Sequence, residues 1–309
     1  KTEKSDSKIH LKITEQKIQT ASKQMKRIFY IMILLPLLAA CGSAKDGYKL
    51  VWSDEFNTDG PVDTTSWNFA SGFRYNFEDQ WYQKDNAWCE EGCLVIEARK
   101  ERFPSPQYKP ESSFWGDKRE FVEYTSSRVN TATKREFLYG RFEMRARIPV
   151  AKGAWPAFWT LGTGCEYGGM PWPQSGEIDI MEYYPVNGEP QILGNVASGA
   201  PGTSKAYWNA KKVPFSHFLE KDPDWASKFH VWRMDWDRDW IRLYLDDELI
   251  NEVDINQMWN TGSWSGYNPH RHPHYILLNL ALGGSNGGPI DDGAFPMRYE
   301  IDYVRVYQR

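Results

Sequence analysis

A strict alternation of apolar and charged residues is the feature that most constrains how this chain can fold. The segment Gly140–Ile148 places Phe142, Met144, Ala146 and Ile148 on one side, with Arg or Glu at the positions between them. Successive side chains of a β-strand point to opposite faces of the sheet. This period of two therefore predicts a strand with one buried face and one polar face.

Similar short runs recur along the chain and are separated by Gly- and Asp-containing turns. They are Leu94–Glu97, Gly176–Tyr184, Phe229–Trp236, Ile241–Asp246, Tyr275–Leu282 and Ile301–Tyr307. A short helix is expected only within Ser216–Lys228. Many short strands with few helices predict an antiparallel sandwich or barrel, and such folds commonly extend over 200–250 residues as one domain. We therefore expect residues 41–309 to form a single all-β domain.

The composition limits the class of ligand. Of the 309 residues, 41% are hydrophobic and 15% are aromatic, which excludes a disordered chain. Residues 1–40 carry eight Lys/Arg and three Asp/Glu, and the remainder carries 29 and 38, a net charge of -9. Proteins that bind nucleic acid present basic surfaces, so no nucleic-acid partner is expected. An acidic body rich in rings suits a neutral ligand that stacks on them.

The first forty residues have the pattern of a targeting segment. Lys26-Arg27 precede the 13-residue apolar run Ile28–Ala40, which is too short to span a membrane. A basic start followed by such a run is typical of a signal peptide, which we expect to begin at Met25 and to be removed. The ending Leu-Ala-Ala-Cys41 resembles a bacterial lipobox, so we expect a lipidated Cys41 and an outer-membrane lipoprotein. An ordinary signal peptide followed by an incidental Cys is the alternative.

Three further cysteines follow the targeting segment. Cys89 and Cys93 flank Glu90-Glu91-Gly92, which is typical of a tight hairpin turn. A cross-strand disulfide is possible there in an oxidising compartment, and two buried thiols are equally compatible with the pattern. Cys165 would then have no partner.

The segment Ser175–Tyr183 is the most informative for function because it contains Glu177, Asp179 and Glu182. Residues two apart share a strand face, so Glu177 and Asp179 point together. Strict alternation would turn Glu182 to the apolar face, where burying a lone carboxylate is costly. A one-residue bulge at Ile180-Met181 would return Glu182 to the acidic face, and bulges are frequent beside active sites.

With that bulge, the backbones of Glu177 and Glu182 would lie roughly 13 Å apart. Side chains that lean together could bring the carboxyl groups to about 5–5.5 Å, the separation found in retaining glycosidases. Crowding acids on one face raises the pKa of at least one of them, as a general acid requires. An acidic strand facing solvent is the alternative, but Trp155, Trp159 and Trp172 lie nearby and would give sugar rings a surface to stack on.

Several segments together resemble glycoside hydrolase family 16, the laminarinase and licheninase group. The resemblance runs from about Leu50 to Tyr307 and is carried by Val51-Trp-Ser-Asp-Glu-Phe56, Leu94-Val-Ile-Glu-Ala98, Tyr139-Gly-Arg-Phe-Glu-Met-Arg-Ala146, Trp155-Pro-Ala-Phe-Trp159, Glu177-Ile-Asp-Ile-Met-Glu182, Asn279-Leu-Ala-Leu-Gly-Gly284 and Ile301–Tyr307. It implies a β-jelly roll sandwich of two bent antiparallel sheets with an open substrate cleft on the concave face. It also implies Glu177 as nucleophile, Asp179 as its helper and Glu182 as acid/base.

The same resemblance implies further site residues. Arg145 and Asn279 match positions that line the family's cleft. A structural calcium ion would be held by the Asp302 side chain and the backbone oxygens of Glu55 and Gly92, an oxygen donor set that suits Ca²⁺. No cofactor is expected for catalysis.

The sequence thus predicts a monomeric, retaining endo-β-glucanase. Gly194–Ala197 lacks the His-containing segment that many laminarinases carry, which favours mixed-linkage β-1,3-1,4-glucan over the β-1,3-glucan laminarin. The acidic body disfavours sulfated galactans, and the presence of both glutamates disfavours a non-catalytic glucan-binding protein. His270, His272 and His274 have the alternation of a metal site, but Pro273 and the lack of a nearby carboxylate favour a loop at the cleft rim.

Overall fold

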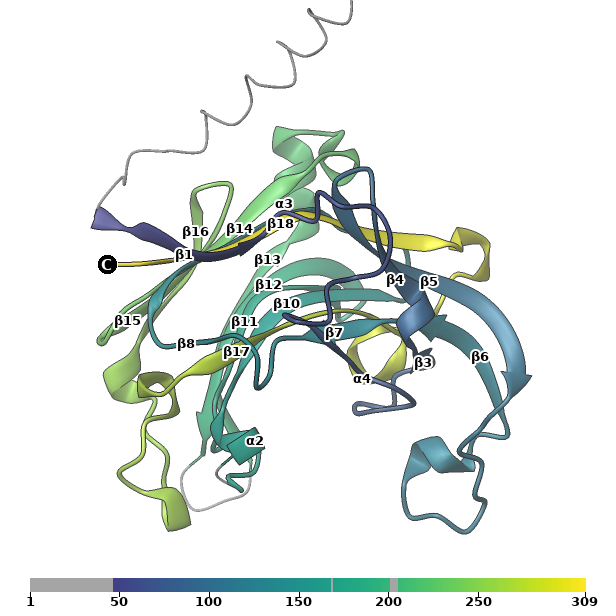
Figure 1. Ribbon diagram of the computed structural model, residues 1–309, viewed down its shortest axis with the longest axis horizontal. Helices are drawn as coiled ribbons and strands as arrows, with labels where there is room; N and C mark the ends of the chain where they lie inside the picture. Colours follow the sequence, from purple (N-terminus) through teal and green to yellow (C-terminus); the bar gives the residue numbers. More distant parts are fainter. Residues whose placement is uncertain (1–46, 168, 201–204) are drawn as a thin grey trace, which may run out of the picture. The chain divides into compact units, whose positions relative to one another are not determined.

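The computed structural model describes residues 47–167, 169–200 and 205–309, and residues 48–309 form one compact unit. Two β-sheets pack against each other in this unit (Figure 1). The predicted signal segment and Cys41 lie outside the described residues. Within the described ranges, no helix combines the length and the apolar character needed to cross a membrane.

The outer, ten-stranded sheet contains β9, the strand predicted from the alternating segment. Its strands follow the order β16 (Glu248–Asp254), β15 (Trp240–Leu245), β14 (His230–Trp236), β9 (Gly140–Arg147), β18 (Met297–Gln308), β5 (Cys93–Pro104), β6 (Phe121–Ser126) and β3 (Gln80–Tyr82), with β1 (Lys49–Asp54) paired to β18 and β4 (Ala87–Glu90) paired to β5. The pairs are antiparallel except for β3 with β6.

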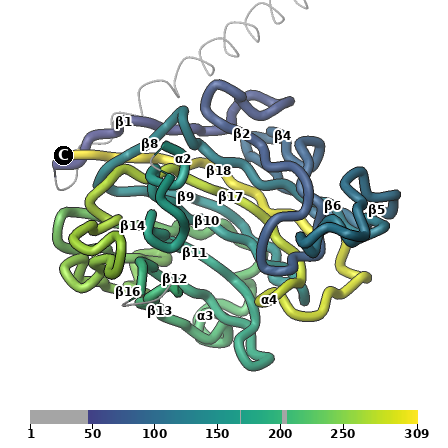
Figure 2. The backbone as a smooth tube through the Cα atoms, turned by 90° about the horizontal axis from the view of Figure 1, so that it is seen from below, coloured from purple at the N-terminus to yellow at the C-terminus, as the bar shows by residue number. Residues whose placement is uncertain are grey.

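The second, eight-stranded sheet carries the acidic segment on β11. Its order is β13 (Ala206–Pro214), β12 (Glu189–Gly199), β11 (Glu177–Val186), β10 (Ala154–Gly162), β17 (His274–Leu282), β7 (Arg128–Asn130) and β2 (Asn68–Phe69), with β8 (Glu136–Phe137) paired to β17. Figure 2 looks onto this sheet and shows β17, β10, β11, β12 and β13 side by side.

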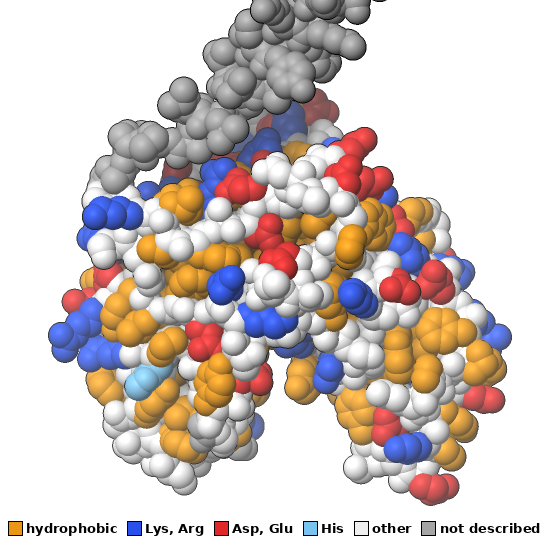
Figure 3. All heavy atoms as spheres, viewed as in Figure 1, with side chains coloured by type: hydrophobic (Ala, Val, Ile, Leu, Met, Phe, Trp, Pro, Cys, Tyr) orange, Lys and Arg blue, Asp and Glu red, His pale blue; other side chains and the backbone are white. Residues whose placement is uncertain are grey.

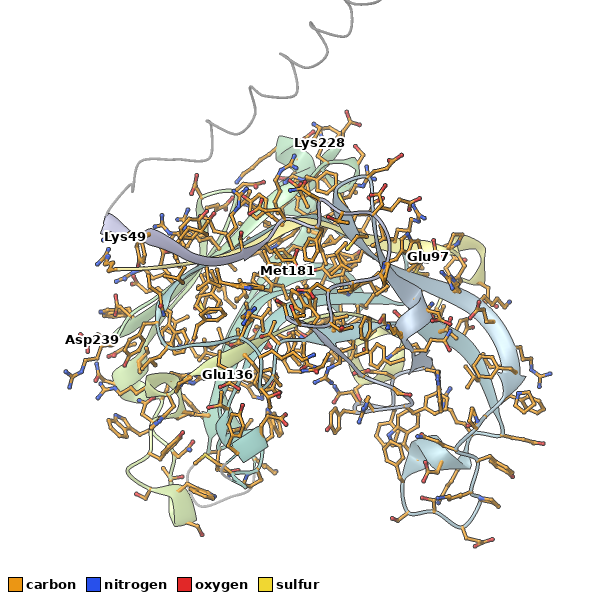
Figure 4. The ribbon with its side chains drawn as sticks, in the orientation of Figure 1. Lys49, Glu97, Glu136, Met181, Lys228 and Asp239 are labelled. Carbon is orange, nitrogen blue, oxygen red and sulfur yellow. The ribbon has the colours of Figure 1, made fainter. Side chains whose placement is uncertain are left out.

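The main core fills the space between the two sheets. Phe142 and Met144 from β9 and Ile178 and Met181 from β11 are fully buried in one apolar cluster, and Met181 lies between the layers in Figure 4. The apolar faces of β9 and β11 are therefore turned toward each other, and the polar side chains of the two strands lie on the outer faces of the sheets.

Helices are few and short in the described residues. They are α2 (Gly164–Tyr167), α3 (Phe215–Lys221) and α4 (Gly284–Gly287), with 3-10 turns at η3 (Lys84–Asn86), η4 (Trp115–Lys118), η5 (Trp225–Ser227), η6 (Ile255–Gln257), η7 (Gly262–Trp264), η8 (Pro269–Arg271) and η9 (Asp292–Ala294). The all-β class, the predicted strands and the short helix near Ser216 are confirmed.

The hairpin between β4 and β5 is present, but its two cysteines are free thiols. Cys89 is paired with Leu94, and Cys93 is paired with Glu90. Paired residues share a sheet face, so Cys89 points into the core while Cys93 points outward. The possible cross-strand disulfide is therefore not formed.

Candidate active site

A cleft of about 1000 Å³ lies on the outer, concave face of the eight-stranded sheet. It is lined by side chains from β13, β12, β11, β10, β17 and β7 and so crosses most of the sheet. Figure 3 shows the surface hollowed between two projecting parts, the region around α2 and the β5–β6 connection. Glu177, Asp179 and Glu182 all lie on the cleft wall.

The predicted bulge in β11 is confirmed by its pairing with both neighbouring strands. Asp179 and Glu182 face Asn195 and Leu193 of β12, so two residues on β11 separate positions that one residue separates on β12. The pairing with β10 shifts at the same place. Ile180 and Met181 are buried in the core, which turns Glu182 outward to share the acidic face.

The three carboxylates accept hydrogen bonds from neutral donors. The indole nitrogen of Trp172 donates to Glu177 Oε2 at 2.8 Å, and that of Trp155 donates to Glu182 Oε1 at 2.8 Å. Asn195 Nδ2 lies 2.9 Å from Glu182 Oε2 and 3.3 Å from Asp179 Oδ2, so one amide donates to both acids. These donors fix the carboxylates in place without adding a positive charge beside them.

Burial is the largest cause that raises the pKa of all three acids. For Glu177 and Asp179 the next cause is repulsion from Glu182; the pKa of Glu177 rises to about 7 and that of Asp179 lies well above its usual range. The pKa of Glu182 is also raised, and the charge of Glu78 contributes. The cluster therefore keeps a proton near neutral pH, which is the condition for general-acid catalysis.

The structure brings the predicted tryptophans and Asn279 to the same cleft. Besides the bonds of Trp155 and Trp172 to the acids, Trp159 Nε1 donates to Asn279 Oδ1 at 2.7 Å. Asn279 Nδ2 in turn donates to the Tyr82 hydroxyl at 3.2 Å. Trp159 and Asn279 are thus held together on the β10–β17 part of the cleft.

Several cleft residues escaped the sequence analysis. Asn195 lies in the segment Gly194–Ala197 and is paired with Asp179, so it shares the face of the acids, which a β-hairpin drawn from the two alternating segments would have indicated. Arg128 lies with its guanidinium 4.9 Å from the Trp159 ring centre, but it belongs to a three-residue strand too short to show a pattern. Glu78, which is 7% exposed, accepts a bond from the Tyr82 hydroxyl at 3.3 Å and anchors the Trp159–Asn279 chain.

The prediction that Arg145 lines the cleft is wrong. Arg145 lies on β9, in the other sheet, and its guanidinium pairs with Asp302 at 2.6 Å. The cleft role of Arg145 comes from its match to a family position, whereas the alternation around it predicts only an outward-facing side chain, which is correct.

The same ion pair bears on the predicted calcium site. Asp302 would be its only side-chain ligand, and this carboxylate is already neutralised by Arg145. A calcium ion would have to compete with this guanidinium for the carboxylate, and the calcium site stays a prediction.

The three alternate histidines do not form a metal site either. The described residues contain no group of three or more His, Cys, Asp or Glu side chains placed to hold a metal ion. His270 and His274 are fully buried, and His274 Nδ1 lies 2.9 Å from the Thr160 hydroxyl. His272 stacks on the Tyr267 ring at 4.1 Å between ring centres. The histidines are packing residues of this segment rather than a rim of the cleft.

The pattern of the Glycosyl hydrolases family 16 matches residues 71–305, a range that includes the bulged strand and all three acids. The chain belongs to this family. It is a glycoside hydrolase with the family's jelly-roll fold.

Known relatives and solved structures agree with this membership. The chain is 36% identical over 288 residues to "Glucan endo-1,3-beta-glucosidase" of Cryptopygus antarcticus, covering 88% of this chain and 96% of that protein. The laminarinase catalytic domain from Thermotoga maritima MSB8 superposes with a TM-score of 0.68 and 34% identity, covering 85% of this chain and 98% of that domain. A structure from work on endo-acting O-glycanases of the human gut microbiota gives a TM-score of 0.74 and 33% identity, covering 85% and 91%.

Proposed function

We propose that this family 16 member is a retaining endo-β-glucanase. The observation that carries the proposal is the β11 bulge, which places Glu177, Asp179 and Glu182 on one cleft face. Two glutamates on either side of a third acid are the groups that double displacement needs, one ionised to attack and one protonated to donate its proton. The cleft crosses the sheet and is open to the surface, so it suits the interior of a long chain rather than a chain end.

In the proposed mechanism Glu182 donates a proton to the glycosidic oxygen while Glu177 attacks the anomeric carbon. The bond from that carbon to the leaving oxygen breaks, and a covalent glycosyl–Glu177 intermediate forms. Glu182, now ionised, takes a proton from water, whose oxygen attacks the same carbon and releases Glu177. The bonds from Trp155 and Asn195 orient the Glu182 carboxyl during both steps.

The linkage preference rests on two opposing observations. The segment Gly194–Ala197 lacks a His, which favours mixed-linkage β-1,3-1,4-glucan. The names of the relative and of the Thermotoga structure favour β-1,3-glucan. We keep mixed-linkage glucan as the leading prediction and β-1,3-glucan as the second. The similarity to the gut O-glycanase structure also makes O-linked glycans a candidate substrate of another kind.

Hydrolysis of lichenan, barley β-glucan, laminarin, agarose and mucin O-glycans, assayed in parallel, tests these substrates. We expect cleavage of barley β-glucan and lichenan into oligosaccharides, with a rapid fall in polymer length that identifies endo-action. Proton NMR of the first products should show the β-anomer. An α-anomer would refute retention, and activity on mucin O-glycans with none on glucans would refute the glucanase proposal.

We also propose that Cys41 carries a lipid that anchors the protein to the outer membrane, on its cell-surface or periplasmic face. The support is the Leu-Ala-Ala-Cys41 ending of the apolar run. Lipid chains would be the membrane anchor, so Cys41→Ala should move the protein from the membrane to the soluble fraction. Fractionation followed by immunoblotting measures this, and a variant that stays in the membrane fraction contradicts the proposal.

A further inference from the structure

The edge strand β13 exposes large aromatic side chains beside the acids. Trp208 on this strand is 41% exposed, and Trp172 from the loop before β11 is 47% exposed. Both line the cleft, and their ring centres lie 6.3 Å apart at an angle of 50°. Exposed aromatic side chains at a sheet edge favour aggregation with other protein chains. Two such rings side by side in the cleft therefore indicate that they bind a ligand.

The strand register places this pair relative to Glu177. Glu177 is opposite Ala197 on β12, and Ala197 is opposite Trp208 on β13. Neighbouring strands are about 4.8 Å apart, so Trp208 lies roughly 10 Å from the Glu177 backbone, in the same row and on the same face.

The side chains that line the cleft between the acids and Trp208 are small. Ala197 occupies the Glu177 row, and Ala210 lies opposite Asn195 in the next row. Because alanine side chains are short, a space remains above them that larger residues would fill, and Trp208 and Trp172 lie at its border. The exposed Lys212 also lines the cleft, in the row of Glu182, where its ammonium can donate hydrogen bonds to hydroxyl groups.

We propose that Trp208 and Trp172 form a sugar-binding subsite on the β13 side of the acids, across from Trp159 and Asn279. Its ligand is a pyranose unit of the glucan chain, held by its apolar ring face against the indoles, with hydroxyl groups directed to Lys212. The inference rests on the proposed glucanase function. It assigns a sugar on the β13 side of the scissile bond, whereas Trp159 lies on the other side. A chain bound across both sides is then cleaved in its interior.

The strand itself supplies a matched control. Tyr207 precedes Trp208, is 44% exposed, and is not among the residues that line the cleft. Trp208→Ala and Tyr207→Ala thus remove neighbouring exposed rings from the same edge, one from the cleft and one from outside it. Trp172 is not suitable for the main test, because its indole bonds to Glu177 and its loss would disturb the nucleophile.

The experiment measures laminarihexaose and barley β-glucan hexasaccharide binding by calorimetry in the Glu177→Gln background, and kcat/KM on the polymers in the otherwise native enzyme. Trp208→Ala should lower oligosaccharide affinity and kcat/KM about tenfold, as loss of one stacked ring predicts. Trp208→Phe, which keeps an aromatic ring, should retain most of the affinity and of kcat/KM. Tyr207→Ala should have the same affinity and kcat/KM as the unsubstituted enzyme. The cleavage position on the hexasaccharides should also shift in Trp208→Ala.

Equal affinity and an unchanged cleavage pattern in Trp208→Ala and Tyr207→Ala would overturn the subsite. If Trp208→Ala fails to fold, an unchanged affinity in the Trp208→Leu variant does the same. Absence of cleavage of every glucan by the unsubstituted enzyme would instead refute the proposed function, so the two failures are distinguishable.

Discussion

The outer faces of the two sheets differ in how their charged side chains are partnered. On the ten-stranded sheet many charges are paired, as in Arg141 with Asp235 at 2.7 Å and Arg305 with Glu55 at 2.7 Å. On the eight-stranded sheet Glu177, Asp179 and Glu182 form no ion pair with any described residue and accept hydrogen bonds from indole and amide groups instead. Both faces arise from the same alternation, so alternation alone does not reveal the difference.

The cleft is set apart by three unpaired acids that lie together on one face. A guanidinium beside a carboxylate lowers its pKa, as it does for Glu55 beside Arg305. Burial without such a partner raises the pKa, as it does for the three acids of the cleft and for the single Glu143 on the outer face of β9. Unpaired, partly desolvated carboxylates in a cleft are the arrangement that favours proton transfer and nucleophilic attack.

The largest expected effect comes from Glu177→Gln. The amide has nearly the same shape but cannot attack the anomeric carbon, so kcat should fall by at least about 10³ while oligosaccharide affinity is retained. Steady-state kinetics and calorimetry measure the two quantities. Glu143→Gln makes the same change on the outer face of β9 and should leave kcat within about twofold. Retention of more than about a tenth of kcat in Glu177→Gln would exclude it as nucleophile.

Deletions in the β11 bulge test how the cleft face is built. Deleting Met181 leaves a regular Glu-x-Asp-x-Glu alternation, so the three acids still share a face and some activity should remain. Deleting Ile180 and Met181 together turns Glu182 toward the core and should abolish activity. Assays of both variants, with circular dichroism to check folding, measure this. A folded, active double deletion beside a folded, inactive single deletion would contradict the assignment of the faces.

The unpaired acids also predict a stability cost that depends on pH. Glu177 has a raised pKa of about 7 in the folded protein, against 4.5 for the free group, so the folded state binds more protons between these values. Stability contributed by this group therefore falls as pH rises from about 4.5 to 7. Glu177→Gln removes this loss, and the variant should be more stable than the native protein by roughly 1–3 kcal/mol at pH 8 and equally stable near pH 4.

Urea unfolding at pH 4 and pH 8 measures this difference. An equal free-energy difference at both pH values would show that Glu177 is not destabilised when ionised. An ordinary surface carboxylate would behave in that way.

The sequence predicted much of this arrangement, and its failures have physical reasons. The strands and the bulge followed from alternation and from the cost of burying Glu182, both of which are local properties. Arg128 and Glu78 were missed because they reach the cleft from short segments whose position depends on distant pairing. Arg145 was misplaced because its cleft role came from a match to a family position, and the segment itself could not correct this, since membership of one sheet or the other is decided by long-range pairing.

Arg145→Ala gives the smallest expected effect and tests that correction. Arg145 and its partner Asp302 have side chains 41% and 35% exposed, and pairs so open to solvent contribute little because water screens them. We expect the free energy of unfolding to fall by no more than about 1 kcal/mol and kcat/KM to stay within about twofold. Denaturant unfolding and polymer assays measure both. A tenfold loss of kcat/KM with unchanged stability would place Arg145 in the substrate path, and the charge-paired face could then no longer be regarded as catalytically silent.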